Sequence, residues 1–176
     1  MKKENIYKLN TSKLWNNYNY VKKYNNFKYS NKDGNTYYMN SRRDEVLKYL
    51  EKLSQNNKTT ILELGYGAGQ NASYFIKKCK KYIGIDISLP LAKFAKIKNK
   101  RYVKSGKAKF LVGSMDKKLK IKSNSVDLII IVGALQYVIN TNYCLSECKR
   151  VLKKNGYLII AQTNTFQINE MIHPRK

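Results

Sequence analysis

Three glycines and two carboxylates have the types and spacing expected of a site for a nucleoside-containing ligand. The glycines are Gly65, Gly67 and Gly69. An apolar run carries one acid, Glu63, and leads directly into them, and a second apolar run ends in Asp86, 21 positions after Gly65. Glycine lets a backbone turn tightly and approach a ligand closely. An acid at about this distance suits the two hydroxyls of a ribose, so the sequence predicts a nucleoside-containing cofactor.

The glycine spacing distinguishes between candidate cofactors. A dinucleotide-binding turn usually has the pattern G-x-G-x-x-G or A, whereas this turn reads G-x-G-x-G and has Gln70 at the sixth position. A dinucleotide also seats its pyrophosphate on the following helix end, where the carboxylate of Glu63 would repel it. The same carboxylate would help to hold a cationic methionine group. The residues therefore favour a sulfonium cofactor over a nicotinamide or a flavin.

Residues 59–163 resemble the core of a class I S-adenosylmethionine-dependent methyltransferase of the broad small-molecule type. Five segments carry the resemblance, and they follow one another in the family's order. They are Glu63–Gly69, Tyr82–Ser88, Val126–Val132, Gly133–Val138 and Cys148–Ile160. Their common order carries more weight than any one segment.

This resemblance implies S-adenosyl-L-methionine as the cofactor and assigns roles to the motif residues. The glycine turn lets the cofactor lie close, Glu63 positions its methionine amino group, and Asp86 accepts hydrogen bonds from its ribose. Ile87 and Met115 enclose the adenine. The implied cofactor-binding residues are Glu63, Gly65, Tyr66, Gly67, Gly69, Asp86, Ile87, Ser114, Met115, Asp116 and Gly133. Gln136 and Tyr137 lie near the methyl group and the acceptor, and they are the candidates for a catalytic role.

The chain departs from the family pattern at two places. Relatives usually carry an acid directly after the third strand, where it meets the adenine amino group, whereas this chain has Ser114. The nearest acid is Asp116, and we expect it to stand in for the missing one. Relatives also continue past the fifth strand with a helix and an antiparallel pair of strands. Because the chain ends at Lys176, we expect those final antiparallel strands to be missing.

Alternating strand and helix patterns predict the elements that position these residues. Strands are expected at 59–64, 81–85, 109–112, 126–132 and 157–161, helices at 41–54, 70–80, 89–98 and 141–153, a turn at 33–35 and a basic loop at 99–107. Right-handed crossovers then give a Rossmann-like α/β fold, an open parallel sheet of order 3-2-1-4-5 with helices on both faces. Its ligand crevice lies at the carboxyl ends of strands one and four, where the order reverses.

A length of 176 residues predicts a single domain. We divide the chain into a basic N-terminal segment, 1–40, a methyltransferase core, 41–163, and a C-terminal tail, 164–176, which holds the only histidine, His173. The N-terminal segment is rich in Asn, Tyr and Lys, and Trp15 begins a series of aromatic residues at roughly helical spacing. Either this segment packs on the domain as an amphipathic helix, or it forms an aromatic lid over the cofactor.

The net formal charge of +24 makes nucleic acid a candidate partner through the basic surface, because such a charge attracts polyanions. Lysine outnumbers arginine thirty to five, however, and Asn and Tyr are abundant beside it, as in the products of A/T-rich genomes. Functional phosphate and base contacts usually favour arginine. The lysines also recur through nearly every segment except the cofactor motifs. We therefore favour a compositional origin of the charge.

Cysteine and hydropathy patterns bear on metal binding and location. Cys79, Cys144 and Cys148 have no paired spacing, and zinc would need more ligands than one histidine adds, so we expect no metal. No apolar stretch approaches the ~20 residues of a membrane helix, and the N-terminus lacks an apolar signal region. We expect an intracellular, cytoplasmic protein with no membrane span.

Three functions remain open at this stage. The first is a methyltransferase of the EC 2.1.1 class with a small-molecule acceptor. The second is an RNA- or ribosome-linked methyltransferase, which the charge alone supports, since residues 133–136 differ from the Asn-Pro-Pro-Tyr-like motif of base-methylating enzymes. The third is a non-catalytic module that binds the cofactor, or has lost it, and serves as a protein partner or self-associates at the open edge of strand five.

Overall fold

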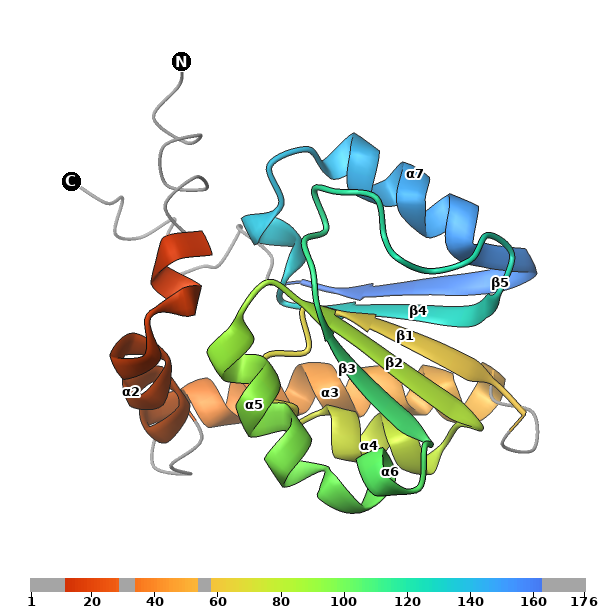
Figure 1. Cartoon of the computed structure of the whole chain (residues 1–176). Coiled ribbons are helices and arrows are strands. Elements are labelled where there is room, and N and C mark those ends of the chain that lie inside the picture. Colours follow the sequence, from red (N-terminus) through yellow and green to blue (C-terminus); the bar gives the residue numbers. More distant parts are fainter. Residues whose placement is uncertain (1–11, 29–33, 54–57, 163–176) are drawn as a thin grey trace, which may run out of the picture.

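The computed structural model describes residues 12–28, 34–53 and 58–162, which build a five-stranded sheet flanked by helices (Figure 1). The strands pair in parallel in the order β3-β2-β1-β4-β5. They are β1 (Thr60–Leu64), β2 (Lys81–Asp86), β3 (Ala108–Val112), β4 (Val126–Val132) and β5 (Leu152–Ala161). The helices are α2 (Tyr18–Lys28), α3 (Gly34–Leu53), α4 (Ala72–Lys77), α5 (Leu89–Lys98), α6 (Lys100–Lys104), η1 (Leu135–Tyr137) and α7 (Thr141–Val151). The predicted Rossmann-like class and strand order are confirmed.

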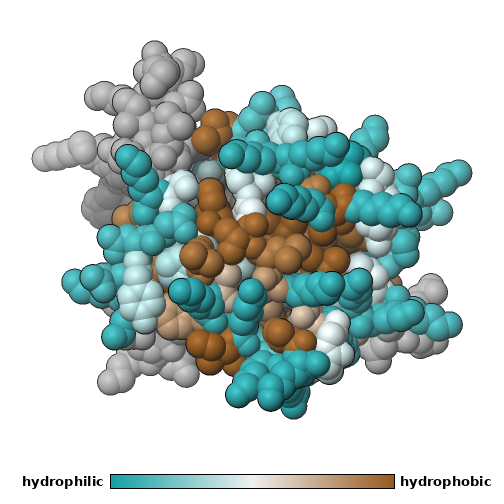
Figure 2. Space-filling model, in the orientation of Figure 1, coloured by the Kyte–Doolittle hydropathy of each residue, from teal (hydrophilic) through white to brown (hydrophobic). Residues whose placement is uncertain are grey.

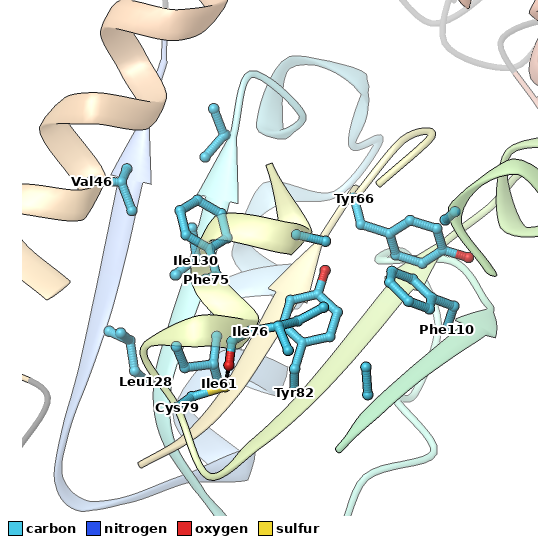
Figure 3. Close-up of a cluster of buried hydrophobic side chains, with 14 of the residues drawn as sticks. Val46, Ile61, Tyr66, Phe75, Ile76, Cys79, Tyr82, Phe110, Leu128 and Ile130 are labelled. Carbon is cyan, nitrogen blue, oxygen red and sulfur yellow. Dashed lines mark hydrogen bonds between the residues drawn. The ribbon is translucent and has the colours of Figure 1, made fainter. Parts of the chain in front are cut away.

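Side chains of the strands alternate between the two faces of the sheet, because successive residues of a strand point in opposite directions. On one face, Ile61 and Ile130 pack with Val46 and Leu50 of α3 and with Phe75 of α4. Figure 3 shows this cluster, with the ring of Tyr82 beside it. Helices α3, α4, α5 and α6 lie on this side of the sheet in Figure 1.

The opposite face is covered by α7. Cys144, Cys148 and Val151 of this helix pack on Leu62 and Ile129 of the two central strands. As a result β4 is buried along nearly its whole length, as expected of a central parallel strand with both faces covered. The cysteines are free thiols that serve as small apolar core residues.

The connection between β3 and β4 lies on the same side as α7 and is held by that helix. The described residues 113–125 contain turns and bends but no helix. Instead, Glu147 accepts from the backbone N–H of Leu119 at 2.8 Å, while Arg150 donates to the carbonyls of Leu119 and Ile121. Edge strand β3 leaves Leu111 and Val112 exposed, and Figure 2 shows apolar side chains in the middle of this view with hydrophilic ones around them.

Several predicted boundaries are wrong. Strand β5 begins at Leu152, inside the helix expected at 141–153 and before the strand expected at 157–161, and α4 covers only Ala72–Lys77 of the helix expected at 70–80. The expected basic loop at 99–107 contains α6, because Tyr102 and Val103 pack partly against the core. Asn99 separates α6 from α5 with its buried amide, which donates to the carbonyls of Gly69 and Ala95. The helix expected at 41–54 begins at Gly34, so the described part of the expected turn at 33–35 is helical.

The expected boundary at residue 40 and the expected N-terminal helix can be compared with the structure, whereas the expectations for the C-terminus cannot. Helix α3 runs across the expected boundary at residue 40. The N-terminal aromatic series is helical at 12–16 and again in α2, where the side chain of Asn17 accepts from the N–H of Tyr20. His173, the tail 164–176 and the site of the expected missing strands lie outside the described residues. No helix in the described part of the chain is both long and apolar enough to cross a membrane.

Candidate active site

A cavity of about 260 Å³ opens at the carboxyl ends of β1 and β4, the point where the strand order reverses. Its volume is close to the lower end, roughly 300 Å³, of small-molecule sites. Residues from β1, β2 and β4, from the loops after β1, β2, β3 and β4, from α3 and α5, and from the N-terminal segment line it. They are Trp15, Tyr24, Arg42, Glu63, Gly65, Tyr66, Gly67, Gln70, Asn71, Ile85, Asp86, Ile87, Leu91, Gly113, Ser114, Met115, Asp116, Val132, Gly133, Ala134, Gln136, Tyr137 and Val138.

The glycine turn after β1 lets two loops approach each other closely. Gly65 has φ +77°, and a Cβ placed on it would lie 2.3 Å from the Cβ of Ala134, in the loop after β4. A side chain at position 65 would therefore push the two loops apart. Gly67 has φ +58°, and a Cβ there would meet nothing within 4 Å, so this residue borders open space.

The carboxylate of Asp86 lies at the end of β2 and is fixed by two backbone donors. Its Oδ2 accepts from the N–H of Gly67 at 2.9 Å, and its Oδ1 accepts from the N–H of Ser88 at 2.9 Å. Burial raises the pKa of Asp86, while these backbone hydrogen bonds oppose the rise. Each carboxylate oxygen has a second lone pair. The group can therefore accept hydroxyl donors from a ligand without losing its bonds to the backbone.

A second carboxylate, Glu63, is almost fully buried in β1 and still contributes to the cavity wall. The hydroxyl of Tyr82 donates to its Oε2 at 2.5 Å. Burial raises the pKa of Glu63 to about 7, although the hydrogen bond from Tyr82 acts in the opposite direction. An acid with such a pKa changes charge near neutral pH and can accept from a cationic donor in the cavity.

Arg42 brings a positive charge into the cavity from α3. A Cβ placed on Gly133 would lie 2.8 Å from its Nη1, so the guanidinium lies directly against this glycine. Gly133 has φ +61°, and both its conformation and this contact require glycine. Arginine presents a planar fork that pairs well with carboxylates. Arg42 and Glu63 together offer one partner for a carboxylate and one for an ammonium group.

Polar residues of the loop after β3 form hydrogen bonds within that loop and to the loop after β4. The hydroxyl of Ser114 accepts from the N–H of Asp116 at 3.1 Å. The Oδ1 of Asp116 accepts from the N–H groups of Ile139 and Asn140, at 2.8 and 2.9 Å. Asp116 therefore ties the β3 loop to the loop after β4. Met115 lies on the inner side of this loop, in the cavity wall.

Aromatic side chains close one end of the cavity. The ring centroid of Trp15 lies 4.8 Å from that of Tyr24 and 5.9 Å from that of Tyr137, with the rings nearly perpendicular. The N-terminal segment that carries Trp15 and Tyr24 packs on α5 through Val21 and Leu91. Segments more than 100 residues apart in the sequence thus meet over the glycine turn.

The structure gathers nearly all of the predicted site residues around this cavity, both candidates for a catalytic role included. The exception is Gly69, which turns toward α5: a Cβ there would meet Asn99 and Ala95 at 2.8 and 2.9 Å. Tyr66 also has a packing role, since its hydroxyl donates to the carbonyl of Leu111 and its ring packs on Phe110. The side-chain oxygen of Gln136 accepts from Gln162 at 2.7 Å.

Two residues of the cavity wall had little signal in the sequence. Arg42 lies in a stretch whose sequence predicts the solvent-exposed start of a helix. The only sign of a functional role is that the residue is arginine, which is rare in this lysine-rich chain. Gln70 follows the glycines but belongs to no motif. Among the described residues, no group of three or more His, Cys, Asp or Glu side chains is placed to hold a metal ion.

The arrangement suits an adenosyl ligand with an amino-acid tail. Asp86 can take the ribose hydroxyls, the space beside Gly67 is open, and Glu63 and Arg42 match an ammonium and a carboxylate. A parallel sheet of this order with such a site at its reversal defines a nucleoside-binding α/β protein. Comparison with known proteins makes the class more specific.

Residues 62–160 match the family described as Methyltransferase domain. The match covers more than half of the chain, and the chain belongs to this family of class I methyltransferases, whose cofactor is S-adenosyl-L-methionine. The chain is 33% identical over 121 residues to the uncharacterized protein MJ0638 of Methanocaldococcus jannaschii, covering 69% of the chain and 48% of that protein. It is 34% identical over 113 residues to MJ1252 of the same organism, covering 64% of the chain and 40% of that protein. It thus spans about half the length, or less, of these relatives.

Solved structures agree on the fold. A SAM-dependent methyltransferase from Aquifex aeolicus is 26% identical, with a TM-score of 0.59 over 67% of this chain and 62% of that one. The YcgJ protein of Bacillus subtilis has a TM-score of 0.60 at 21% identity, over 66% of this chain and 49% of that one. The cyclase SpnF has a TM-score of 0.59 at 20% identity, over 66% of this chain and 43% of that one. The last two likenesses show the fold alone.

Proposed function

We propose that this protein is an active methyltransferase that transfers the methyl group of S-adenosylmethionine to a small-molecule acceptor. The observation that carries the proposal is the buried carboxylate of Asp86, held by the N–H of Gly67 beside the cavity. A methyltransferase domain with this arrangement has both the ribose partner and the open backbone turn that the cofactor requires. Fold alone would not support the activity, since one fold hosts many chemistries.

In this proposal the residues of the wall have separate roles. Asp86 accepts from the ribose hydroxyls, Glu63 accepts from the methionine ammonium group, and Arg42 pairs with the methionine carboxylate. Ile87 and Met115 enclose the adenine, with Asp116 beside it. Tyr66, Ser114 and the glycines shape the pocket, with Gly69 acting through its contact with α5.

For this reaction, the main task of the protein is to align the acceptor atom with the methyl group of the cofactor. S-adenosylmethionine supplies a methyl group that is already activated on a sulfonium. Proximity and orientation therefore provide much of the acceleration, and a base is needed only if the acceptor must lose a proton early. Gln136 and Tyr137 border the cavity from the loop after β4. We assign them to the positioning of the acceptor.

A small acceptor is favoured over RNA by the composition of the cavity. The described wall contains three carboxylates and one guanidinium, whereas the lysines of the described residues lie outside it. Phosphate groups gain from cations close to them, and this wall offers few. The N-terminal segment adds the aromatic rings of Trp15 and Tyr24 to the wall, and such a wall suits a small molecule.

Calorimetric titration with S-adenosylhomocysteine tests the cofactor site. We expect Asp86→Asn to bind about 10- to 100-fold more weakly than the wild type, because hydrogen bonds to a charged group contribute about 1.5–3 kcal/mol. Asp44→Asn, on the exposed face of α3, is the matched control and should bind as the wild type does. Equal affinity of Asp86→Asn and the wild type, with both variants folded, would refute the ribose assignment.

Catalysis needs a separate measurement. Wild-type protein with S-adenosylmethionine and a deproteinised small-molecule extract should release S-adenosylhomocysteine, and mass spectrometry should detect a product heavier by one methylene unit. Extracted RNA is the comparison sample. Cofactor binding without turnover on any sample would support the non-catalytic module instead.

A further inference from the structure

The aromatic end of the cavity is built from two segments that each join a different part of the site. The backbone carbonyl of Trp15 accepts from the hydroxyl of Ser88, two residues after Asp86. Tyr137 belongs to η1, directly after the Gly133 loop. The rings of Tyr24 and Tyr137 make angles of 87° and 78° with the ring of Trp15. The three rings therefore meet nearly at right angles and are not stacked in parallel. We call the side chains of Trp15, Tyr24 and Tyr137 the aromatic corner.

The charge of the cavity wall is opposite to that of the whole chain. The chain has 35 Lys and Arg residues against 11 Asp and Glu residues. The described wall, by contrast, contains Glu63, Asp86 and Asp116 with Arg42 as its only basic residue. Repulsion from surface lysines is largely screened beyond about 8 Å at physiological ionic strength. A cationic group inside the cavity is therefore influenced mainly by the carboxylates and the rings near it.

We propose that the aromatic corner is the acceptor subsite and that it takes the amine or ammonium group of a small molecule. This inference rests on the proposed function. Ring faces carry partial negative charge and attract cations. Aliphatic amines are also good nucleophiles once unprotonated, so the reaction can proceed with the carboxylates, amides and rings that the described wall supplies.

The charge balance of the reaction favours the same position. An amine nitrogen that receives the methyl group uses its lone pair for the new N–C bond while the C–S bond breaks. The positive charge leaves the sulfur, which becomes a neutral thioether, and appears on the nitrogen. The aromatic corner would stabilise this charge as it forms. An acceptor that arrives as an ammonium ion first gives a proton to water, which frees the lone pair for attack. Any proton that the product nitrogen then loses also passes to water.

Trp15 is the only tryptophan of the chain, so intrinsic tryptophan fluorescence reports on the aromatic corner. Wild-type protein saturated with S-adenosylhomocysteine is titrated with choline and, separately, with its neutral carbon isostere 3,3-dimethylbutan-1-ol. The two probes have the same shape and differ in charge. We expect choline to bind about 5- to 30-fold more tightly, as cation–π contacts of about 1–2 kcal/mol require.

Three variants test whether the aromatic ring of Tyr137 is responsible for the preference for choline. Tyr137→Leu should lower choline affinity toward that of the neutral isostere, whereas Tyr137→Phe keeps the ring and should retain most of the preference. Tyr49→Leu removes an exposed tyrosine of α3 and should leave both affinities unchanged. Equal binding of the two probes, no binding of either, or equal effects of Tyr137→Leu and Tyr49→Leu would overturn the acceptor inference. Failure to bind S-adenosylhomocysteine at all would instead overturn the proposed function.

Discussion

The hydroxyl of Ser88 joins the N-terminal segment to the loop after β2, because it donates to the backbone carbonyl of Trp15. The same hydroxyl accepts from the N–H of Leu91 at 3.1 Å and so caps helix α5. Asn16 adds a second link, accepting from the N–H of Leu89 at 3.1 Å. One buried serine thus connects the loop after Asp86 to the aromatic corner.

Ser88→Ala should loosen this connection. Loss of an N-cap costs about 1 kcal/mol, and loss of the contact to Trp15 should let the indole become more solvated. We expect a lower midpoint of urea unfolding and a red shift of tryptophan emission. Asn140→Ala is the matched control, because Asn140 caps α7 by accepting from the N–H of Tyr143. It should cost similar stability and leave the emission unchanged, and an equal red shift in both variants would contradict the connection.

Gly65→Ala should be strongly destabilising. The substitution places a side chain at φ +77° and brings its Cβ within 2.3 Å of Ala134, so backbone strain and overpacking add to roughly 2–5 kcal/mol. Gly106→Ala provides the comparison, since Gly106 has φ +73° but nothing within 4 Å of a Cβ. It should cost only about 1–2 kcal/mol. Urea unfolding of the two variants measures the difference, and equal losses would show that the contact between the loops is relaxed easily.

Gly67→Ala separates cofactor binding from stability. Its φ of +58° and the open space around a Cβ resemble those of Gly106, so the two alanine variants should lose similar stability. Gly67 lines the cavity and its backbone N–H donates to the Asp86 carboxylate, so a Cβ at position 67 would enter the open space beside this turn. We therefore expect at least a tenfold loss of affinity for S-adenosylhomocysteine in Gly67→Ala by calorimetry. Gly106→Ala should bind normally, and normal binding by both would place the cofactor away from the turn.

Glu63 should make stability depend on pH. Burial raises its pKa from the ordinary value of 4.5 to about 7, so the folded protein holds a proton that the unfolded chain has already released. Stability should therefore fall as the pH rises from about 4.5 to about 7, by up to about 3 kcal/mol, and Glu63 adds no further change above that range. Urea unfolding between pH 5 and pH 8 measures this slope.

Glu63→Gln tests the assignment, because it keeps an acceptor for Tyr82 and does not titrate. The slope between pH 5 and pH 7 should be smaller in this variant than in the wild type. Glu51→Gln, an exposed acid paired with Lys78, should keep the full slope. If Glu63→Gln and the wild type have the same slope, Glu63 ionises normally in the fold.

Much of the fold and of the site follows from local patterns in the sequence. Strand β4 and helix α5 have the predicted bounds, because a run of apolar residues, or apolar residues at helical spacing, records burial directly. Glu63, Gly65, Gly67 and Asp86 were also predictable, since each is tied to a strand end. Once the strand order is known, the carboxyl ends of β1, β2 and β4 must lie together.

Only the tertiary structure could decide which distant segments meet at that edge. Trp15 contacts Tyr137, and Arg42 lies against Gly133. Both contacts depend on how the N-terminal segment and α3 pack on the rest of the fold, and short-range sequence patterns do not predict such long-range packing. Gly69 has the appearance of a ligand-binding glycine but packs on α5, and α6 forms where lysines predicted a loop. At the first three positions, the deciding neighbour is close in space and distant in sequence. In α6, the deciding side chains are Tyr102 and Val103, which are partly buried and lie among basic residues.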